Sequence, residues 1–173
     1  MNRINHRRTG FTLVEMIAAT AIMAVLTTSS FALVRTANDA WRRHRDDVLQ
    51  RGQALATLQH VIRRVRQAAQ VTAISPPADM SGFLTLQMAD GTTAMWDHDG
   101  AANQVLYGTI APTDLLAEGV TQVNFTGLSA DGLTQSTDPT KIHAVRCLAT
   151  YTLNRPAGTT TESVSCSAWL RAW

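Results

Sequence analysis

The chain has 173 residues, of which 45% are hydrophobic and 16% are charged, with two cysteines and a formal net charge of +2. This length fits one modest globular domain on a long stem and excludes a chain of several large domains. Only about 100 residues lie beyond residue 70, so the core is small and such a domain is marginal on its own.

The positive charge belongs to the N-terminal part of the chain. The first ten residues carry Arg3, Arg7 and Arg8 and no acid, and their removal leaves 12 basic and 13 acidic side chains, a net charge of −1. Residues 35–70 hold eight arginines against three aspartates, whereas residues 71–173 hold nine acids against four basic side chains. The basic character therefore says little about the globular part.

Residues 11–34 form an apolar segment in which Glu15 is the one charged residue. As a helix this segment rises about 36 Å, more than a hydrocarbon core of about 30 Å, so it can span a membrane. Serine and threonine at 27–30 are tolerated because their hydroxyls can bond back to the helix backbone. The basic leader, residues 1–10, is expected to stay in the cytoplasm, which places the rest of the chain across the membrane.

An ordinary secretory signal peptide, cleaved after residues 30–32, is the alternative interpretation. Two features oppose it. A carboxylate within a membrane helix costs about 2–3 kcal/mol, and an ordinary signal has no use for Glu15. Helical periodicity also continues well beyond residue 34, where a cleaved signal ends.

Residues 7–15 resemble the class III signal of type IV pilins and type II secretion pseudopilins. The shared features are the basic leader, Gly10, Phe11, the Thr-Leu pair that follows, and Glu15 at its required offset. The resemblance implies that a prepilin peptidase cuts after Gly10 and that Phe11 becomes the N-methylated first residue. It also implies that Glu15 pairs with the terminal amine of a neighbouring subunit, since a buried carboxylate needs a partner, and sets the register between subunits.

Apolar or small residues recur every seven positions beyond the membrane segment, which predicts one long amphipathic helix with a near-heptad seam. Leu58 and Val65 supply the intervening steps. This stem, residues 35–74, is expected to end near Ile74 because Ser75 precedes two prolines. The seam consists of Val34, Trp41, Val48, Leu55, Ile62 and Ala69.

Arginine clusters on the stem raise the alternative of nucleic-acid binding. A solvated helix face is the simpler interpretation, because Asp39, Asp46 and Asp47 partly neutralise the charge. Trp41 lies on the apolar seam and leaves the basic face without a stacking residue, so nucleic acid is not an expected partner. The clusters are Arg42, Arg43, Arg45, Arg63, Arg64 and Arg66.

Residues 78–173 are expected to form an antiparallel β domain, because short strand patterns alternate with glycine-containing turns. With the long helix this gives an α+β class. The resemblance implies the type IV pilin-like fold, in which a long N-terminal transmembrane and amphipathic helix packs on an antiparallel sheet. The expected strands are 83–88, 94–96, 104–110 and 119–125, followed by a hairpin of two longer strands near 145–153 and 164–170.

The two cysteines fall on the apolar faces of this hairpin. A turn at 155–158 makes the numbers of opposed residues sum to 313, which sets Cys147 opposite Cys166. Directly opposed strand residues have Cα separations of about 4.5–5.5 Å, within disulfide range, and a periplasmic location permits the bond. A disulfide between Cys147 and Cys166 is therefore predicted, with two buried free thiols as the alternative.

No constellation typical of an enzyme or of a bound ion is recognised in the sequence. Residues 97–100, Asp-His-Asp-Gly, faintly resemble the start of a calcium loop, but the later ligands are missing and a hairpin turn is favoured. No Cys/His set has zinc spacing, and no glycine-rich phosphate loop is found. We expect no catalytic residue, no metal and no cofactor, so the alternative of a signal-anchored periplasmic enzyme lacks support.

Several stretches beyond the leader resemble the J-type minor pseudopilin of type II secretion. They are residues 55–59 and 63–68 of the stem, residues 116–125, and the closing strand near 144–146. The tryptophan-rich middle region common in that type is absent, and residues 130–141 are rich in Ser, Thr and Asp instead.

By resemblance, such a subunit joins other minor pseudopilins at the pseudopilus tip and helps to initiate assembly of the filament for protein export. Its further partners are the major pseudopilin, the prepilin peptidase/N-methyltransferase and an inner-membrane assembly platform. The expected location is a single pass through the inner membrane with a periplasmic C-terminal domain, before assembly into the pseudopilus. The alternative is a minor pilin of a type IV pilus or of a DNA-uptake machine.

Overall fold

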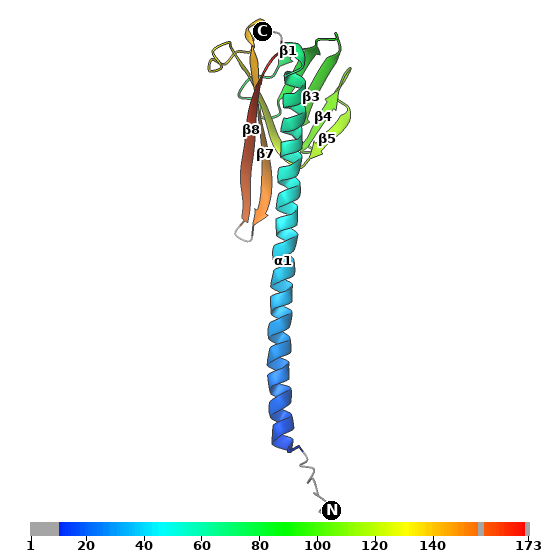
Figure 1. The fold of residues 1–173 in the computed structure, drawn as a ribbon, viewed down its shortest axis with the longest axis vertical. Coiled ribbons are helices and arrows are strands. Elements are labelled where there is room, and N and C mark those ends of the chain that lie inside the picture. The colour runs from blue at the N-terminus through cyan, green and yellow to red at the C-terminus, as the bar shows by residue number, and fades with distance from the viewer. Residues whose placement is uncertain (1–10, 156–157, 172–173) are drawn as a thin grey trace, which may run out of the picture. The chain divides into compact units, whose positions relative to one another are not determined.

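The computed structural model describes residues 11–155 and 158–171, so the leader with Gly10 lies outside the described part. The chain divides into two compact units between Arg42 and Arg43, and each is described by itself. The first unit is helical and the second is α+β (Figure 1). The described elements are α1 (Leu13–Val65), β1 (Ala68–Ile74), β2 (Phe83–Met88), β3 (Thr93–Asp99), β4 (Gln104–Gly108), β5 (Asp114–Glu118), β6 (Val120–Leu128), the 3-10 helix η1 (Pro139–Lys141), β7 (Ala144–Arg155) and β8 (Gly158–Trp169).

The strands form two antiparallel sheets. β1 to β5 follow one another in a five-stranded sheet, and β6, β7 and β8 form a three-stranded sheet, also in consecutive order. Main-chain bonds join the two sheets, because Gly82 donates its N–H to the Val123 carbonyl at 2.8 Å and Val123 donates to the Met80 carbonyl at 3.0 Å. This arrangement confirms the predicted α+β class and fits the type IV pilin-like fold.

The helix ends at Val65, so the predicted end near Ile74 was wrong. The residues that follow form β1, which pairs antiparallel with β2 and sets Ile74 opposite Leu84. Val71, Thr72 and Ile74 are β-branched and suit a strand. Pairing with a distant segment therefore overrides the helical periodicity well before the two prolines are reached.

The buried face of α1 is also displaced from the predicted seam. Leu55 was expected to face the core but is 38% exposed, and Ile62 is half-buried. Leu58 and Val65 are buried as predicted, and Ile62 packs against the edge of the core. Two of the buried residues are small, which lets the helix approach the sheets closely. The buried residues are Ala54, Thr57, Leu58, Val61 and Val65.

One hydrophobic core joins this helix face to both sheets. Its largest fully buried side chains are Trp96 on β3, Phe125 on β6 and Tyr151 on β7. Figure 1 shows β7 and β8 on one side of the C-terminal part of α1 and β3 to β5 on the other. A single helix face thus supplies the packing surface for both sheets.

The strand predictions were right for β2 and incomplete elsewhere. β3 extends through Asp97, His98 and Asp99, which the sequence had assigned to a turn. The turn follows at Gly100, where Asp99 Oδ1 accepts the N–H of Ala101 at 2.9 Å. β1 and the short acidic strand β5 were not predicted, because neither shows a clear alternation that local patterning could detect.

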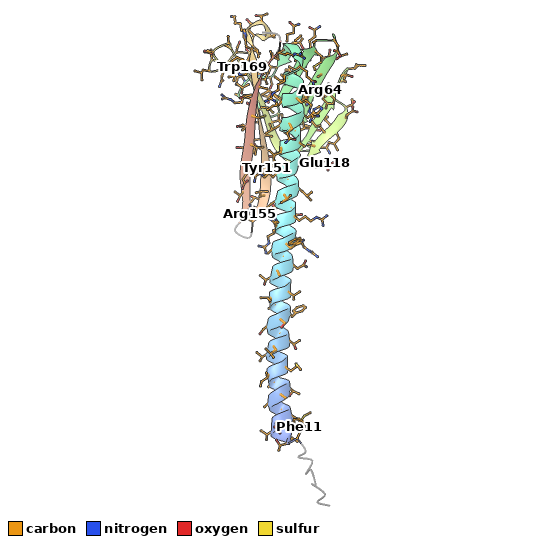
Figure 2. The ribbon with its side chains drawn as sticks, viewed as in Figure 1. Phe11, Arg64, Glu118, Tyr151, Arg155 and Trp169 are labelled. Carbon is orange, nitrogen blue, oxygen red and sulfur yellow. The ribbon has the colours of Figure 1, made fainter. Side chains whose placement is uncertain are left out.

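The final hairpin has the predicted register. β7 and β8 pair without interruption from Ala144 opposite Trp169 to Arg155 opposite Gly158. Figure 2 shows Tyr151 and Arg155 on this hairpin beside α1. The Arg155 guanidinium pairs with the Asp47 carboxylate of α1 and fixes the end of β7 against the helix, although such a partly exposed pair adds little stability.

A cluster of rings holds α1 against β3 and β4. The Trp96 indole N–H donates to His60 Nδ1 at 3.1 Å, and the His60 ring meets the Tyr107 ring edge-on at a centroid distance of 4.6 Å. The Arg64 guanidinium lies 6.0 Å from the centroid of the Tyr107 ring. Burial, followed by the charges of Arg64 and Arg63, lowers the pKa of His60 from its ordinary value of 6.5. The neutral imidazole is therefore the form that the fold favours.

This cluster predicts a loss of stability on mild acidification. Because the pKa of His60 is lower in the folded chain, the unfolded chain binds the proton more readily. The contribution of His60 to stability is present above pH 6.5 and is lost as the pH falls through the lowered pKa. Urea unfolding of the full chain at pH 7.5 and at 5.5 measures the effect. His60→Gln keeps an acceptor for Trp96 but does not titrate, so its loss between the two pH values should be smaller. Equal losses in the two proteins would contradict this role.

Candidate functional site

The start of α1 brings together two residues of the processing motif. Glu15 donates its main-chain N–H to the Thr12 hydroxyl at 3.3 Å, and Glu15 Oε2 accepts the Thr12 N–H and hydroxyl, each at 3.4 Å. This reciprocal arrangement is a capping box, which satisfies main-chain N–H groups that the first turn of a helix leaves without partners. A Thr-x-x-Glu spacing before an apolar run is typical of such a box, so Thr12 could have been identified from the sequence but was not.

The capping box leaves acceptor positions of the Glu15 carboxylate free. All three of its contacts are longer than the usual hydrogen-bond range of about 2.7–3.2 Å, so they are weak. Oε2 accepts two of them, and an ionised carboxylate offers about four acceptor positions. The side chain can therefore take a cationic partner without giving up its place at the helix start.

In the apolar part of α1, hydroxyl side chains donate hydrogen bonds to main-chain carbonyls of the same helix. Thr20 donates its hydroxyl to the Met16 carbonyl at 3.0 Å, Thr27 to the Met23 carbonyl at 2.7 Å, and Ser29 to the Val25 carbonyl at 2.8 Å. The back-bonding expected for the hydroxyls of this segment is thus confirmed. Length and composition make α1 the helix, among those described, that could cross a membrane. Within the described part of the chain, every residue from 13 to 34 of this helix is exposed.

The two cysteines lie opposite each other on β7 and β8, as the register predicted. Both are free thiols in this structure, with Cys147 buried and Cys166 half-buried, so the predicted bond is not formed in it. Burial, and then the neighbouring Cys166, raises the pKa of Cys147 well above its ordinary value. Burial raises the pKa of Cys166 to about 11. At neutral pH both groups are therefore thiols, the less reactive form.

Ser81 and His98 form a pair that resembles part of a hydrolytic site. The hydroxyl of Ser81 lies 3.1 Å from His98 Nδ1, and His98 Nε2 lies 2.8 Å from the Val120 carbonyl. A carbonyl only accepts, so Nε2 carries the hydrogen and Nδ1 accepts from Ser81. A triad needs a carboxylate on the second ring nitrogen, and a carbonyl holds that place here. The buried ring of His98 instead ties β3 to β6.

Metal-binding residues are not gathered in the described part of the chain. Within residues 11–155 and 158–171, no group of three or more His, Cys, Asp or Glu side chains is placed to hold an ion. Asp99, from the weak calcium-loop resemblance, uses its Oδ1 to accept the N–H groups of Ala101 and Ala102 at 2.9 and 3.1 Å. This carboxylate therefore stabilises the turn between β3 and β4.

Comparison with known families matches residues 5–31 to the prokaryotic N-terminal methylation motif. The matched residues include the Gly10–Phe11 junction, which lies partly outside the described residues, and Glu15. No curated protein and no solved structure gives a significant match. The motif indicates a type IV pilin-like protein with a prepilin-type signal. It implies processing by a prepilin peptidase and assembly with other pilin-type subunits.

The opposed cysteines predict a bond that forms on enzymatic oxidation. Joining Cys147 to Cys166 closes a loop of about 20 residues, for which the chain-entropy model gives about 3 kcal/mol of stability. Non-reducing peptide mapping of the chain taken from its membrane should show the two cysteines linked, and a reductant should lower the urea midpoint. A variant with both cysteines changed to serine should show no effect of the reductant. Two thiols that are readily alkylated in the unfolded, unreduced protein would contradict the bond.

Proposed function

We propose that this chain is a structural subunit of a pilin-type filament, and that it serves as a minor pseudopilin of a type II secretion system. In this role it lies at or near the pseudopilus tip and helps to initiate assembly for protein export. The observation that carries the proposal is the prepilin-type signal of residues 5–31, which leads into a helix whose apolar side chains are exposed.

Residues 11–34, which include the start of α1, need an apolar surrounding that the described chain does not supply. Phe11, Leu13 and Phe31 are 80%, 75% and 69% exposed, and every other residue of this segment is exposed as well. A helix that is apolar all round belongs inside a membrane or among other helices. A cut after Gly10 leaves the whole segment on the mature chain, so lipid surrounds it first and neighbouring subunits later.

The predicted seam supports contact with partner helices rather than with the chain's own core. Val34, Trp41 and Val48 are 65%, 72% and 56% exposed, and they follow one another at intervals of seven residues. Such a repeat suits packing between helices. We therefore assign the N-terminal part of the seam to contacts with other pseudopilins.

The finer assignment rests on the distal resemblance to J-type subunits, which includes residues 63–68 and 116–125. Its partners would be other minor pseudopilins, the major pseudopilin and the inner-membrane assembly platform, with the α+β domain in the periplasm. Deleting the locus tests this directly. Loss of exoprotein secretion with twitching and DNA uptake intact supports the secretion role. Loss of twitching or of DNA uptake alone would assign the subunit to a type IV pilus or a DNA-uptake machine.

Processing at Gly10 is the first prediction of this proposal. The mature chain should begin at N-methylated Phe11, and Gly10→Leu should leave the precursor uncut because a bulky side chain obstructs the close approach of the peptidase. Intact-mass measurement of the membrane fraction distinguishes the two forms, and Thr9→Ala is a neighbouring change that should still be cut. A mature chain that starts beyond Ala32 would overturn the proposal.

The second prediction of this proposal concerns the charge of Glu15. Glu15→Gln keeps the capping-box geometry, since glutamine serves at this position, but removes the charge that would pair with a neighbour's terminal amine. We expect Glu15→Gln and Glu15→Val to be inserted and cut normally, yet to crosslink poorly to partner pseudopilins. Glu15→Asp should be intermediate, because its carboxylate is drawn back by one methylene.

Immunoblots of the processed fraction and crosslinking in the same strains provide the two readouts. Thr12→Val is the matched control, because it breaks the capping box and keeps the Glu15 charge. If Glu15→Gln is recruited like wild type while Thr12→Val is not, Glu15 serves its own helix and the register role is wrong.

A further inference from the structure

The outer edge of β8 is the least protected strand edge in the described part of the chain. β8 pairs with β7 over twelve consecutive positions with no register shift, and its other edge has no main-chain partner among the described residues. Residues 158–169 contain neither proline, lysine nor arginine, and Glu162 is the one charged residue. Proteins usually blunt a free edge with charge, proline, a bulge or a short strand.

The other three outer strands show those protections. β1 pairs with two register shifts, at Ala68/Gln70 and Val71/Ala73. β5 is short and carries Asp114 and Glu118 at its ends. The outer edge of β6 is partly paired, because Val123 exchanges main-chain bonds with residues 80–82. The open edge of β8 is thus an exception within this fold.

An apolar groove of about 610 Å³ runs between this edge and α1. It is lined by Val164, Ser165 and Cys166, three consecutive residues whose side chains alternate between the two faces of the strand. The groove therefore lies beside the middle of β8, the outermost strand of its sheet. Across from the strand it is lined by Leu55, which the predicted seam had wrongly placed in the core, and by the half-buried Ile62.

The rim of the groove is basic and able to form hydrogen bonds. Arg63 and Arg66 line it and are exposed, and neither is in an ion pair within the described residues. Gln59 and Gln67 also line it and offer amide groups to a main chain. Uncompensated guanidinium groups beside an apolar surface favour a ligand that carries carboxylates.

We propose that β8 and α1 form a docking site for an extended segment of a partner protein, which adds as a strand to the free edge of β8. Its apolar side chains, at every second position, fill the groove between Val164 and Leu55. Acidic residues of the same segment pair with Arg63 and Arg66. Main-chain hydrogen bonds to β8 provide the affinity, and the groove provides specificity for the side chains of the segment, as in other cases of strand addition. This site is independent of the processing motif.

A designed peptide tests the site on the full chain held in phosphatidylcholine nanodiscs. The probe is a labelled seven-residue peptide that alternates glutamate or threonine with valine, with glutamate at both ends and both termini blocked. One matched peptide has lysine in place of glutamate. A second has its alternate main-chain nitrogens methylated, which removes the edge-pairing donors and keeps the side chains. Fluorescence anisotropy gives the affinities, and amide hydrogen exchange locates the binding.

We expect the dissociation constant of the acidic peptide to be lower than that of the lysine peptide by a factor of about five or more. One modest ion pair supplies a factor of this size. The methylated peptide should not bind, and exchange should slow in residues 158–169. Val164→Lys should abolish binding, whereas Leu133→Lys, at an exposed apolar position outside the groove, should not. Arg63→Glu combined with Arg66→Glu should reverse the preference toward the lysine peptide, and both arginines are exposed, so the fold should persist.

Three results would overturn the proposal. Equal binding of the methylated peptide would mean that the groove takes side chains without strand addition. Self-association of the chain that Val164→Lys abolishes, with no peptide binding, would make a second copy the occupant. No binding of the acidic peptide up to millimolar concentration, with no slowing of exchange in β8, would leave the edge without this function.

Discussion

The core of this protein depends on a narrow stripe of one helix. The residues from Ala54 to Val65 that face inward must pack against the five-stranded and the three-stranded sheet together. Apolar burial contributes roughly 25 cal/mol per Å², so a stripe of small and medium side chains gives the domain modest support. Because the core uses only this stripe, most of the remaining surface of α1 is free for lipid, for other helices and for the groove beside β8. Asp47, His60 and Arg64 are exceptions, because they contact the strands.

The parts of the fold that arise from local pairing could be predicted from the sequence. The β7–β8 register follows from a short turn and two alternating strands, and it set Cys147 opposite Cys166 correctly. The end of α1 could not be predicted in this way. Residues up to Ile74 continue an acceptable helical pattern, and only pairing with β2, which lies beyond two prolines, converts them to a strand.

The same division holds for the functional residues. Gly10, Phe11 and Glu15 could be predicted as processing and assembly residues because the methylation motif is a short linear pattern, which is complete in the sequence. The capping box of Thr12 was equally local and was readable by its spacing. The groove could not be predicted from the sequence, because Leu55 and Val164 are far apart in the chain and line the same groove only once β8 has folded beside α1.

β8 is the last of the described strands along the chain, and the core needs it. Ala168 and Leu170 are 3% and 5% exposed, and Leu170 donates its N–H to the His143 carbonyl at 2.9 Å. Synthesis proceeds from the N-terminus, so α1 is made long before this strand exists. A chain that stops before β8 leaves the main-chain groups along one edge of β7, from Ala144 to Arg155, without their partners. The three-stranded sheet can therefore be completed only after the chain has been made through residue 169, well after α1 is in place.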